Sequence, residues 1–171
     1  QIAKASSGQQ VGVVMLTGPL MKAVSSTEAG TSTVQARRDI RKAANDPDVS
    51  AILIAIDSPG GTVAGTADLA AEVRAAAKKK PVWAYVADLG ASAAYWVASQ
   101  AEKVLANDRT ALVGSIGTLA VVYDLSAAAE QAGVKTLVFG TGPRKGAAAP
   151  GAPVTAEQQA YFRGLVEGAQ K

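Results

Sequence analysis

The apolar residues of this chain fall into short runs that alternate between two kinds of spacing. The run Ala51 to Ile56 is apolar at every position, which is typical of a strand covered on both faces in a parallel sheet. The segment Thr33 to Ala44 instead has the spacing of a helix and is closed by Asn45, Asp46 and Pro47. Because strands and helices alternate in this way along the chain, the pattern predicts an α/β fold with a mainly parallel sheet.

The expected elements follow one another with turns rich in Gly, Pro, Asn and Asp between them. The expected strands cover Val11 to Leu16, Ala51 to Ile56, Val82 to Val86, Lys103 to Ala106 and Val134 to Phe139. The expected helices cover Thr33 to Ala44, Thr62 to Lys79, Ala91 to Ala98, Leu125 to Ala132 and a segment that runs to Glu167 with Thr155 as its N-cap.

The length and composition indicate one globular domain. The chain has 171 residues, of which 49% are hydrophobic and 18% charged, and this suits a single well-filled core. We expect a single domain over residues 1–171, in which the polar and small residues 1–10 form a flexible lead-in.

The absence of two residue types limits the chemistry. The chain contains no histidine and no cysteine, so a hydrolytic site here has to use Lys, Asp, Glu or an N-terminal amine as its base. The acidic residues are scattered, and oxygen ligands alone would have to hold any metal. We therefore expect neither a metal nor an organic cofactor.

The net charge of +3 is spread along the chain, apart from two basic runs at residues 37–42 and 78–80 that we interpret as solvated helix faces. Nucleic-acid binding is not expected, because no basic cluster with interleaved aromatic residues is present. No apolar run is long enough to span a membrane, so we expect a soluble chain as given. The chain starts at Gln1 rather than at Met, which is typical of a processed or truncated form. Membrane contact is expected only if an upstream anchor was removed.

Three segments place polar groups or exposed backbone directly after a buried strand, where α/β sheets usually build their sites. The first, Asp57 to Gly61, ends in two glycines whose backbone can approach a ligand and present N–H groups to an oxyanion. An ordinary glycine turn before a helix explains the same residues. The second, Asp88 to Trp96, sets Ser92 among small residues at a helix start, where a nucleophile or a helix cap is expected.

The third segment is the Gly-rich loop Gly142 to Pro150, in which Lys145 has small apolar neighbours instead of carboxylates. Such surroundings favour the neutral amine that a general base requires. An exposed surface lysine is the simpler interpretation of this residue taken alone.

Taken in order, the segments resemble the signal peptide peptidase A family of serine-lysine peptidases, within the Clp/crotonase superfamily. Residues 58–61 resemble the family's SPGG turn, residues 91–96 its ASGGYW helix, residues 114–117 its GSIG turn and residues 142–145 its G-x-x-K loop. The resemblance spans nearly the whole chain and implies a Clp/crotonase-like fold of repeated ββα and βα units.

Carried over by position, the resemblance implies a serine endopeptidase. Ser92 is the nucleophile, Lys145 the base and Ser115 the hydroxyl that orients the lysine amine, while Gly61 and Ala93 supply oxyanion N–H groups. Two departures stand out. Ala93 and Ala94 replace the usual glycines after the serine, and Pro143 and Arg144 (within 142–145) stand where an aromatic residue often precedes the lysine.

The resemblance also implies partners and a place of action. Residues 18–22 and the chain length are most similar to the bacteriophage and prophage branch, whose members act in capsid maturation; signal peptides are the substrate class of the cellular branch. The implied partners are a peptide or protein substrate in extended form and further copies of the chain, in a homo-oligomeric ring that shares the serine and lysine between subunits. The implied location is the cytoplasm of a bacterial host or a phage prohead, or a membrane surface if an anchor is present.

Two alternatives remain open on the sequence. A crotonase-like enzyme acting on acyl-CoA would share the fold, but such enzymes usually employ carboxylates, and Asp88 is the only one in the serine and lysine segments. A non-catalytic scaffold subunit would keep the fold without cutting its partner. The retained Ser92, Ser115 and Lys145 favour the peptidase.

Overall fold

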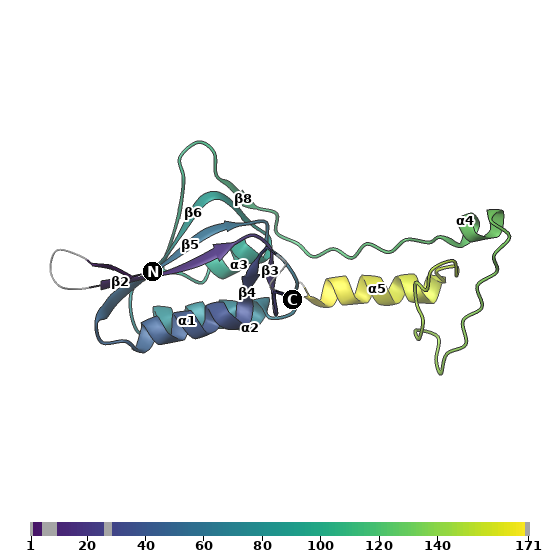
Figure 1. The fold of residues 1–171 in the computed structure, drawn as a ribbon, viewed down its shortest axis with the longest axis horizontal. Helices are drawn as coiled ribbons and strands as arrows, with labels where there is room; N and C mark the ends of the chain where they lie inside the picture. Colours follow the sequence, from purple (N-terminus) through teal and green to yellow (C-terminus); the bar gives the residue numbers. More distant parts are fainter. Residues whose placement is uncertain (1, 5–9, 26–28, 170–171) are drawn as a thin grey trace. The chain divides into compact units, whose positions relative to one another are not determined.

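The computed structural model describes residues 2–4, 10–25 and 29–169, which form two compact units (Figure 1). Unit 1 comprises residues 1–116 and unit 2 residues 117–171. The expectation of a single domain over the whole chain stays a prediction.

Unit 1 is built on a twisted sheet with the order β1-β2-β5-β6-β7, in which β8 also pairs with β6. β1 is antiparallel to β2, and every other pair in this sheet is parallel. The α/β class with a mainly parallel sheet is thus confirmed. The strands are β1 (Ile2–Lys4), β2 (Gln10–Thr17), β5 (Val49–Ser58), β6 (Val82–Ala91), β7 (Lys103–Ala106) and β8 (Leu112–Gly114), with a separate parallel pair β3 (Leu20–Met21) and β4 (Thr31–Ser32).

The first residues of the chain differ from the expected lead-in. Residues 2–4 form strand β1, in which Ile2 pairs with Gly12 and Lys4 with Gln10 of β2. Residues 2–4 show no apolar periodicity, but a strand at the edge of a sheet pairs with a neighbour on one side only. Residues 5–9 lie outside the described residues.

The core lies between the sheet and the helices α1 (Thr33–Asn45), α2 (Thr66–Ala77) and α3 (Ala93–Ala98). Along β5 the side chains alternate, so that Ile52, Ile54 and Ile56 are buried while Ala51, Leu53 and Ala55 are half-buried. Figure 1 shows α1 and α2 together on one side of the strands. The fully apolar run 51–56 therefore has its isoleucines against the helices of this unit.

The other side of the sheet carries apolar side chains that none of the described helices of unit 1 covers. Met15 is 59% exposed and Trp83 40% exposed. The ammonium group of Lys103 lies 4.6 Å from the centre of the Trp83 ring, which is within the range of a cation–π contact.

The helix boundaries of unit 1 follow local chemistry. The hydroxyl of Ser32 accepts the N–H of Gln35 and caps α1. The expected helix from Thr62 starts later, at Thr66, because Gly65 adopts φ +87, which an α-helix does not accommodate. The hydroxyl of Thr66 instead donates to the Thr62 carbonyl oxygen over 2.7 Å.

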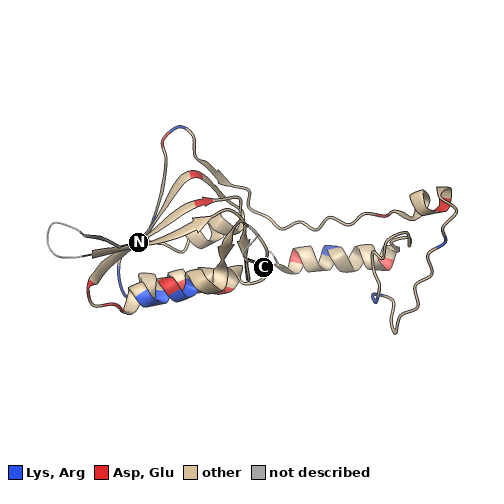
Figure 2. Cartoon of the chain, in the orientation of Figure 1, with Lys and Arg blue, Asp and Glu red and all other residues tan. Residues whose placement is uncertain are grey.

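The basic run 37–42 pairs with acids of the neighbouring helix, in addition to facing solvent. Arg37 reaches Asp68 over 3.2 Å, and Arg41 forms an ion pair with Glu72. The hydrogen bond that Arg41 donates to Glu72, and then the charge of Glu72, raises the pKa of Arg41. Figure 2 shows blue and red residues along this helix pair. The pairs tie α1 to α2, although such exposed pairs stabilise a fold only modestly.

Unit 2 contains α4 (Ser126–Gln131) and α5 (Ala156–Ala169), joined by irregular chain. The expected cap at Thr155 is confirmed, since its hydroxyl accepts the N–H of Gln158 over 3.2 Å. The side-chain oxygen of Gln158 accepts the Thr155 N–H in return, over 3.3 Å. This reciprocal pair is a capping box that fixes the start of α5.

The strand expected over Val134 to Phe139 is wrong, because these residues pair with no strand among those the structure describes. A strand needs a neighbour with free backbone groups. The chain beside this segment is folded into turns, in which Ala149 N–H donates to Gly146 and Ala152 N–H to Ala149. The apolar character of the segment was therefore not sufficient to make a strand.

Within the part of the chain that the structure describes, no helix has the length and hydropathy of a membrane span.

Candidate active site

Ser92 occupies the turn between the end of β6 and the start of α3. Its backbone has φ +53 and ψ −122, a combination that L-residues other than glycine rarely adopt. The expected helix start at Ala91 moves to Ala93, because residues Leu89, Gly90 and Ala91 pair with β8 and extend the strand. A strained residue of this kind, in a turn after a parallel strand, is typical of functional sites.

The Ser92 hydroxyl does not cap the helix that follows it. No side-chain hydrogen bond from Ser92 reaches the first turn of α3. The backbone carbonyl of Ser92 instead accepts the N–H of Trp96 over 3.0 Å. The structure thus removes the simplest structural explanation for the serine, and its half-buried side chain is left available for chemistry.

The glycine turn after β5 lies directly against Ser92. A Cβ atom placed on Gly60 would come within 2.8 Å of the Ser92 Cβ and 2.9 Å of the Ala93 nitrogen. Gly60 also has φ +95, which favours glycine. Both the available space and the backbone conformation therefore require glycine at position 60. The contact brings together two segments that lie about 30 positions apart in the sequence.

Buried hydrogen bonds fix the shape of that turn. The hydroxyl of fully buried Ser58 donates to the Gly18 carbonyl oxygen over 2.6 Å and accepts the N–H of Gly60 over 3.2 Å. Leu20 bonds to the carbonyl of Gly60 and to the N–H of Thr62, on either side of Gly61. Because backbone groups alternate in direction in an extended chain, the N–H of Gly61 points away from Leu20.

Ser115 follows the strand that supports the serine turn. The Ser92 N–H donates to the Gly114 carbonyl oxygen over 2.7 Å. Ser115 has a positive φ of +51, as Ser92 does. The structure thus gathers Gly61, Ser92, Ala93 and Ser115 at the carboxyl ends of β5, β6 and β8.

Lys145 belongs to unit 2, so its pairing with Ser92 stays a prediction. It lies exposed in a tight loop, in which its N–H donates to the Gly142 carbonyl oxygen over 3.0 Å.

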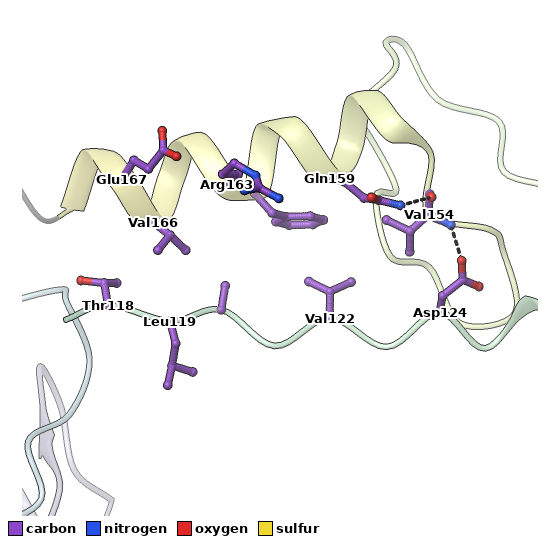
Figure 3. Close-up of a pocket in the computed structure, with 11 residues that line it drawn as sticks. Thr118, Leu119, Val122, Asp124, Val154, Gln159, Arg163, Val166 and Glu167 are labelled. Atoms are coloured by element: carbon purple, nitrogen blue, oxygen red, sulfur yellow. Dashed lines mark hydrogen bonds between the residues drawn. The ribbon is translucent and has the colours of Figure 1, made fainter. Parts of the chain in front are cut away.

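Unit 2 contains a cavity of about 650 Å³ between α5 and the extended chain at residues 118–124 (Figure 3). Figure 3 shows Val122 and Val166 on its facing walls, and Val154 donating its N–H to Asp124. The pKa of Asp124 is lowered, first by the Ser126 hydroxyl and then by the N–H groups of Val154 and Ser126. Neither Ser92 nor Lys145 lines this cavity, and its wall is largely apolar.

Among the described residues, no group of three or more acidic side chains is close enough to hold a metal ion.

The sequence reasoning missed the supports of the site. The sequence predicts that the backbone of Gly60 approaches a ligand, whereas in the structure Gly60 lies directly against Ser92. The contacts of the Gly114 carbonyl oxygen and of the buried Ser58 hydroxyl are likewise not predicted by the sequence. The sequence does carry a signal for Ser58, because a serine at the end of a strand with an apolar run needs a hydrogen-bond partner when it is buried.

Comparison with known proteins places the chain. The family model "Peptidase family S49" matches residues 74–171, which include Ser92, Ser115 and Lys145. The chain belongs to peptidase family S49. The predicted resemblance to signal peptide peptidase A and its phage branch is thereby confirmed.

Relatives of this S49 chain come from both phages and cells. It is 39% identical to capsid assembly protease C of Escherichia phage lambda over 106 residues, or 62% of this chain and 24% of that protein. It is 32% identical to protease 4 of Salmonella typhi over 142 residues, or 81% of this chain and 22% of that protein. The chain thus spans about a quarter of the length of these relatives.

Among solved structures, the S49 chain is similar to an enoyl-CoA hydratase/isomerase family member. The TM-score is 0.49 at 13% identity, over 79% of this chain and 52% of that one. The fold class rests on the sheet of unit 1 itself.

Proposed function

We propose that this chain is a serine endopeptidase that works through Ser92 and Lys145. The observation that carries the proposal is the Ser92 turn, in which a strained serine with an uncapped hydroxyl lies against Gly60. Membership of a peptidase family supports the same reaction class.

Acylation begins when the neutral amine of Lys145 takes the proton of the Ser92 hydroxyl. The Ser92 Oγ then bonds to the carbonyl carbon of the scissile peptide, and the carbonyl π electrons move to its oxygen. When this tetrahedral intermediate collapses, the C–N bond breaks and Lys145 returns the proton to the leaving amine. The acyl group remains on Ser92 as an ester.

Water completes the cycle with the same base. Lys145 removes a proton from water, the hydroxide oxygen attacks the ester carbon, and the Ser92 oxygen leaves with that proton. Ser115 is proposed to hold the lysine amine by a hydrogen bond. The substrate fragment departs as a carboxylic acid.

Gly61 and Ala93 are proposed to stabilise the oxyanion through their backbone N–H groups. The outward direction of the Gly61 N–H supports its part in this role. Replacing glycine by alanine at position 93 keeps the N–H, and the methyl narrows the space for the substrate side chain. Small or apolar residues beside the scissile bond are therefore expected.

The partners proposed are an extended peptide or protein and further copies of this chain. The similarity to a phage capsid assembly protease supports a capsid or scaffold protein as the substrate, and the similarity to protease 4 makes signal peptides the second substrate class to test. Placement of Ser92 and Lys145 in different units is compatible with a ring in which neighbouring subunits share the pair. The proposed location is the host cytoplasm or the prohead, with membrane contact only through an anchor outside this sequence.

The decisive experiment compares the wild-type chain with Ser92→Ala and Lys145→Ala on unfolded casein and a fluorogenic peptide library. Labelling of Ser92 by a serine-directed phosphonate and the oligomeric state are measured in parallel. Loss of cleavage in both variants, with labelling abolished in Ser92→Ala, is the expected result. An assembled wild type that neither cleaves nor labels would instead favour an acyl-CoA enzyme or a scaffold subunit.

A further inference from the structure

The loop that carries Lys145 has a definite shape of its own. Successive turns close it, with Lys145 N–H donating to Gly142, Ala147 N–H to Arg144 and Ala149 N–H to Gly146 over 3.0 to 3.2 Å. Ala148 has φ +60, a value that a non-glycine residue rarely takes. The loop is therefore a folded element of unit 2, although it is neither helix nor strand.

One contact to α5 involves the residue next to the lysine. The guanidinium carbon of Arg144 lies 4.8 Å from the centre of the Tyr161 ring, which is the geometry of a cation–π contact. Tyr161 is half-buried on α5, so its ring is a firm support.

A second contact to α5 holds the backbone one residue earlier. The amide nitrogen of Gln158 donates to the Pro143 carbonyl oxygen over 3.0 Å. The oxygen of the same side chain accepts the Thr155 N–H in the capping box. Because both ends of the amide are engaged, Gln158 links the start of α5 to the loop in one orientation.

The loop also packs against the chain that precedes it. A Cβ atom on Gly140 would lie 3.0 Å from the Lys145 Cβ, and one on Gly146 would lie 2.5 Å from the Val138 Cγ1. The first carbons of the Lys145 side chain are thus packed against Gly140, and the amine extends from this packed part of the side chain.

We propose that Tyr161 and Gln158 of α5 are positioning residues for Lys145. This inference rests on the proposed function, in which Lys145 is the general base. The two residues contact Pro143 and Arg144, which directly precede the lysine. Tyr161 supplies from α5 an aromatic ring beside the loop.

A general base works only within hydrogen-bond reach of the proton it takes, and small displacements are costly. Loosening the loop is therefore expected to lower kcat and leave substrate binding little changed. We expect Tyr161→Leu to lower kcat about tenfold with KM within about twofold. Tyr161→Phe keeps the ring face and is the matched control, with kcat within about twofold of the wild type.

The kinetic outcome discriminates positioning from folding. An equal kcat in Tyr161→Leu and Tyr161→Phe would overturn the proposal, and so would a rise in KM with kcat unchanged. Oligomeric state and thermal midpoint are recorded for each variant, so that a loss by unfolding is identified as such.

A second measurement is independent of peptidase activity. Trypsin must take the Arg144 or Lys145 side chain into its own pocket, so cleavage in this loop reports how often the loop leaves α5. We expect Tyr161→Leu to raise the rate of cleavage after Arg144 about two- to fivefold over both wild type and Tyr161→Phe.

Gln158→Glu tests the second contact in the same assay. Glutamate keeps the oxygen that caps α5 and removes the N–H that Pro143 accepts, so faster cleavage is expected with unchanged helix content. Unchanged or slower cleavage would remove Gln158 from the proposal. If the wild type proves inactive towards peptides, the tryptic rates still decide whether α5 holds the loop, and that outcome counts against the proposed function alone.

Discussion

The backbone N–H of Ser92 donates to the carbonyl oxygen of Gly114, with 2.7 Å between nitrogen and oxygen. This bond ties the proposed nucleophile to the residue before Ser115, the proposed partner of the lysine amine. Both serines have positive φ values, +53 and +51, so each depends on its neighbours to hold a costly conformation. The two hydroxyls are therefore set by one local structure, at the ends of β6 and β8.

Gly60→Ala is expected to destabilise unit 1 and to abolish phosphonate labelling of Ser92. The added methyl would meet the Ala91 carbonyl oxygen and the Ser92 Cβ at 2.8 Å, and the backbone has φ +95. We expect the free energy of unfolding in urea to fall by about 2 to 4 kcal/mol. Gly164→Ala is the control, because nothing lies within 4 Å of a Cβ there, and it is expected to stabilise α5 by up to about 1 kcal/mol. Full labelling of a folded Gly60→Ala variant would contradict the site described.

Mixing the two inactive variants tests whether subunits share the site. If Ser92 of one subunit works with Lys145 of its neighbour, an exchanged mixture of Ser92→Ala and Lys145→Ala regains about a quarter of the wild-type activity. Half of the subunits offer the serine, and half of their neighbours offer the lysine. Exchange is verified with differently tagged copies, and no recovery after verified exchange would indicate that each chain builds its own site.

Lys80→Met is expected to lower the free energy of unfolding by about 1 to 2 kcal/mol. The ammonium group of Lys80 donates to the carbonyl oxygens of Ala43 and Asp46, at the C-terminal end of α1. The basic run 78–80 is thus not wholly a solvated surface. Lys78→Met, at the exposed cap of α2, is the control and is expected to change stability by less than about 0.5 kcal/mol. Equal effects of the two substitutions would show that Lys80 does not stabilise α1.

The hydrogen bond between Asp124 and Val154 in unit 2 is expected to be sensitive to acid. Hydrogen bonds from the Ser126 hydroxyl and from the Val154 and Ser126 N–H groups lower its pKa in the folded chain. Because the folded pKa is the lower one, this contribution is complete above the unfolded value of about 3.9 and is lost as the pH falls through the folded value. We expect the Val154 amide resonance to shift with an apparent pKa below about 3.9, and Asp124→Asn to remove that titration. A midpoint at or above the ordinary value would contradict the link.

The elements with strong local signals were predictable from the sequence. The run 51–56 became the centre of β5, and Thr155 caps α5 as expected, because each depends on residues close in the chain. The position of Ser92 at a strand-to-helix turn followed from the same kind of pattern.

The supports of the site were not predictable in this way. The conformation of Ser92 depends on Gly60 and Gly114, which lie 32 positions before it and 22 after it. Residues 134–139 have the composition of a strand, but whether a strand forms depends on a neighbour with free backbone groups. Pairing of residues 89–91 with β8 likewise extends β6 beyond its apolar run.

The backbone N–H of Trp96 donates to the Ser92 carbonyl oxygen, so an indole ring lies one helical turn from Ser92 and its fluorescence can report on that turn. The chain has two tryptophans, and the other, Trp83, lies on the uncovered face of the sheet. In a Trp83→Phe background all indole emission therefore originates one helical turn from the proposed nucleophile. Because Trp96 is 41% exposed, its emission is sensitive to the polarity around that turn. Formation and breakdown of the proposed ester on Ser92 are then expected to change this emission, so that the reaction is followed in time without an attached dye or a chromogenic substrate.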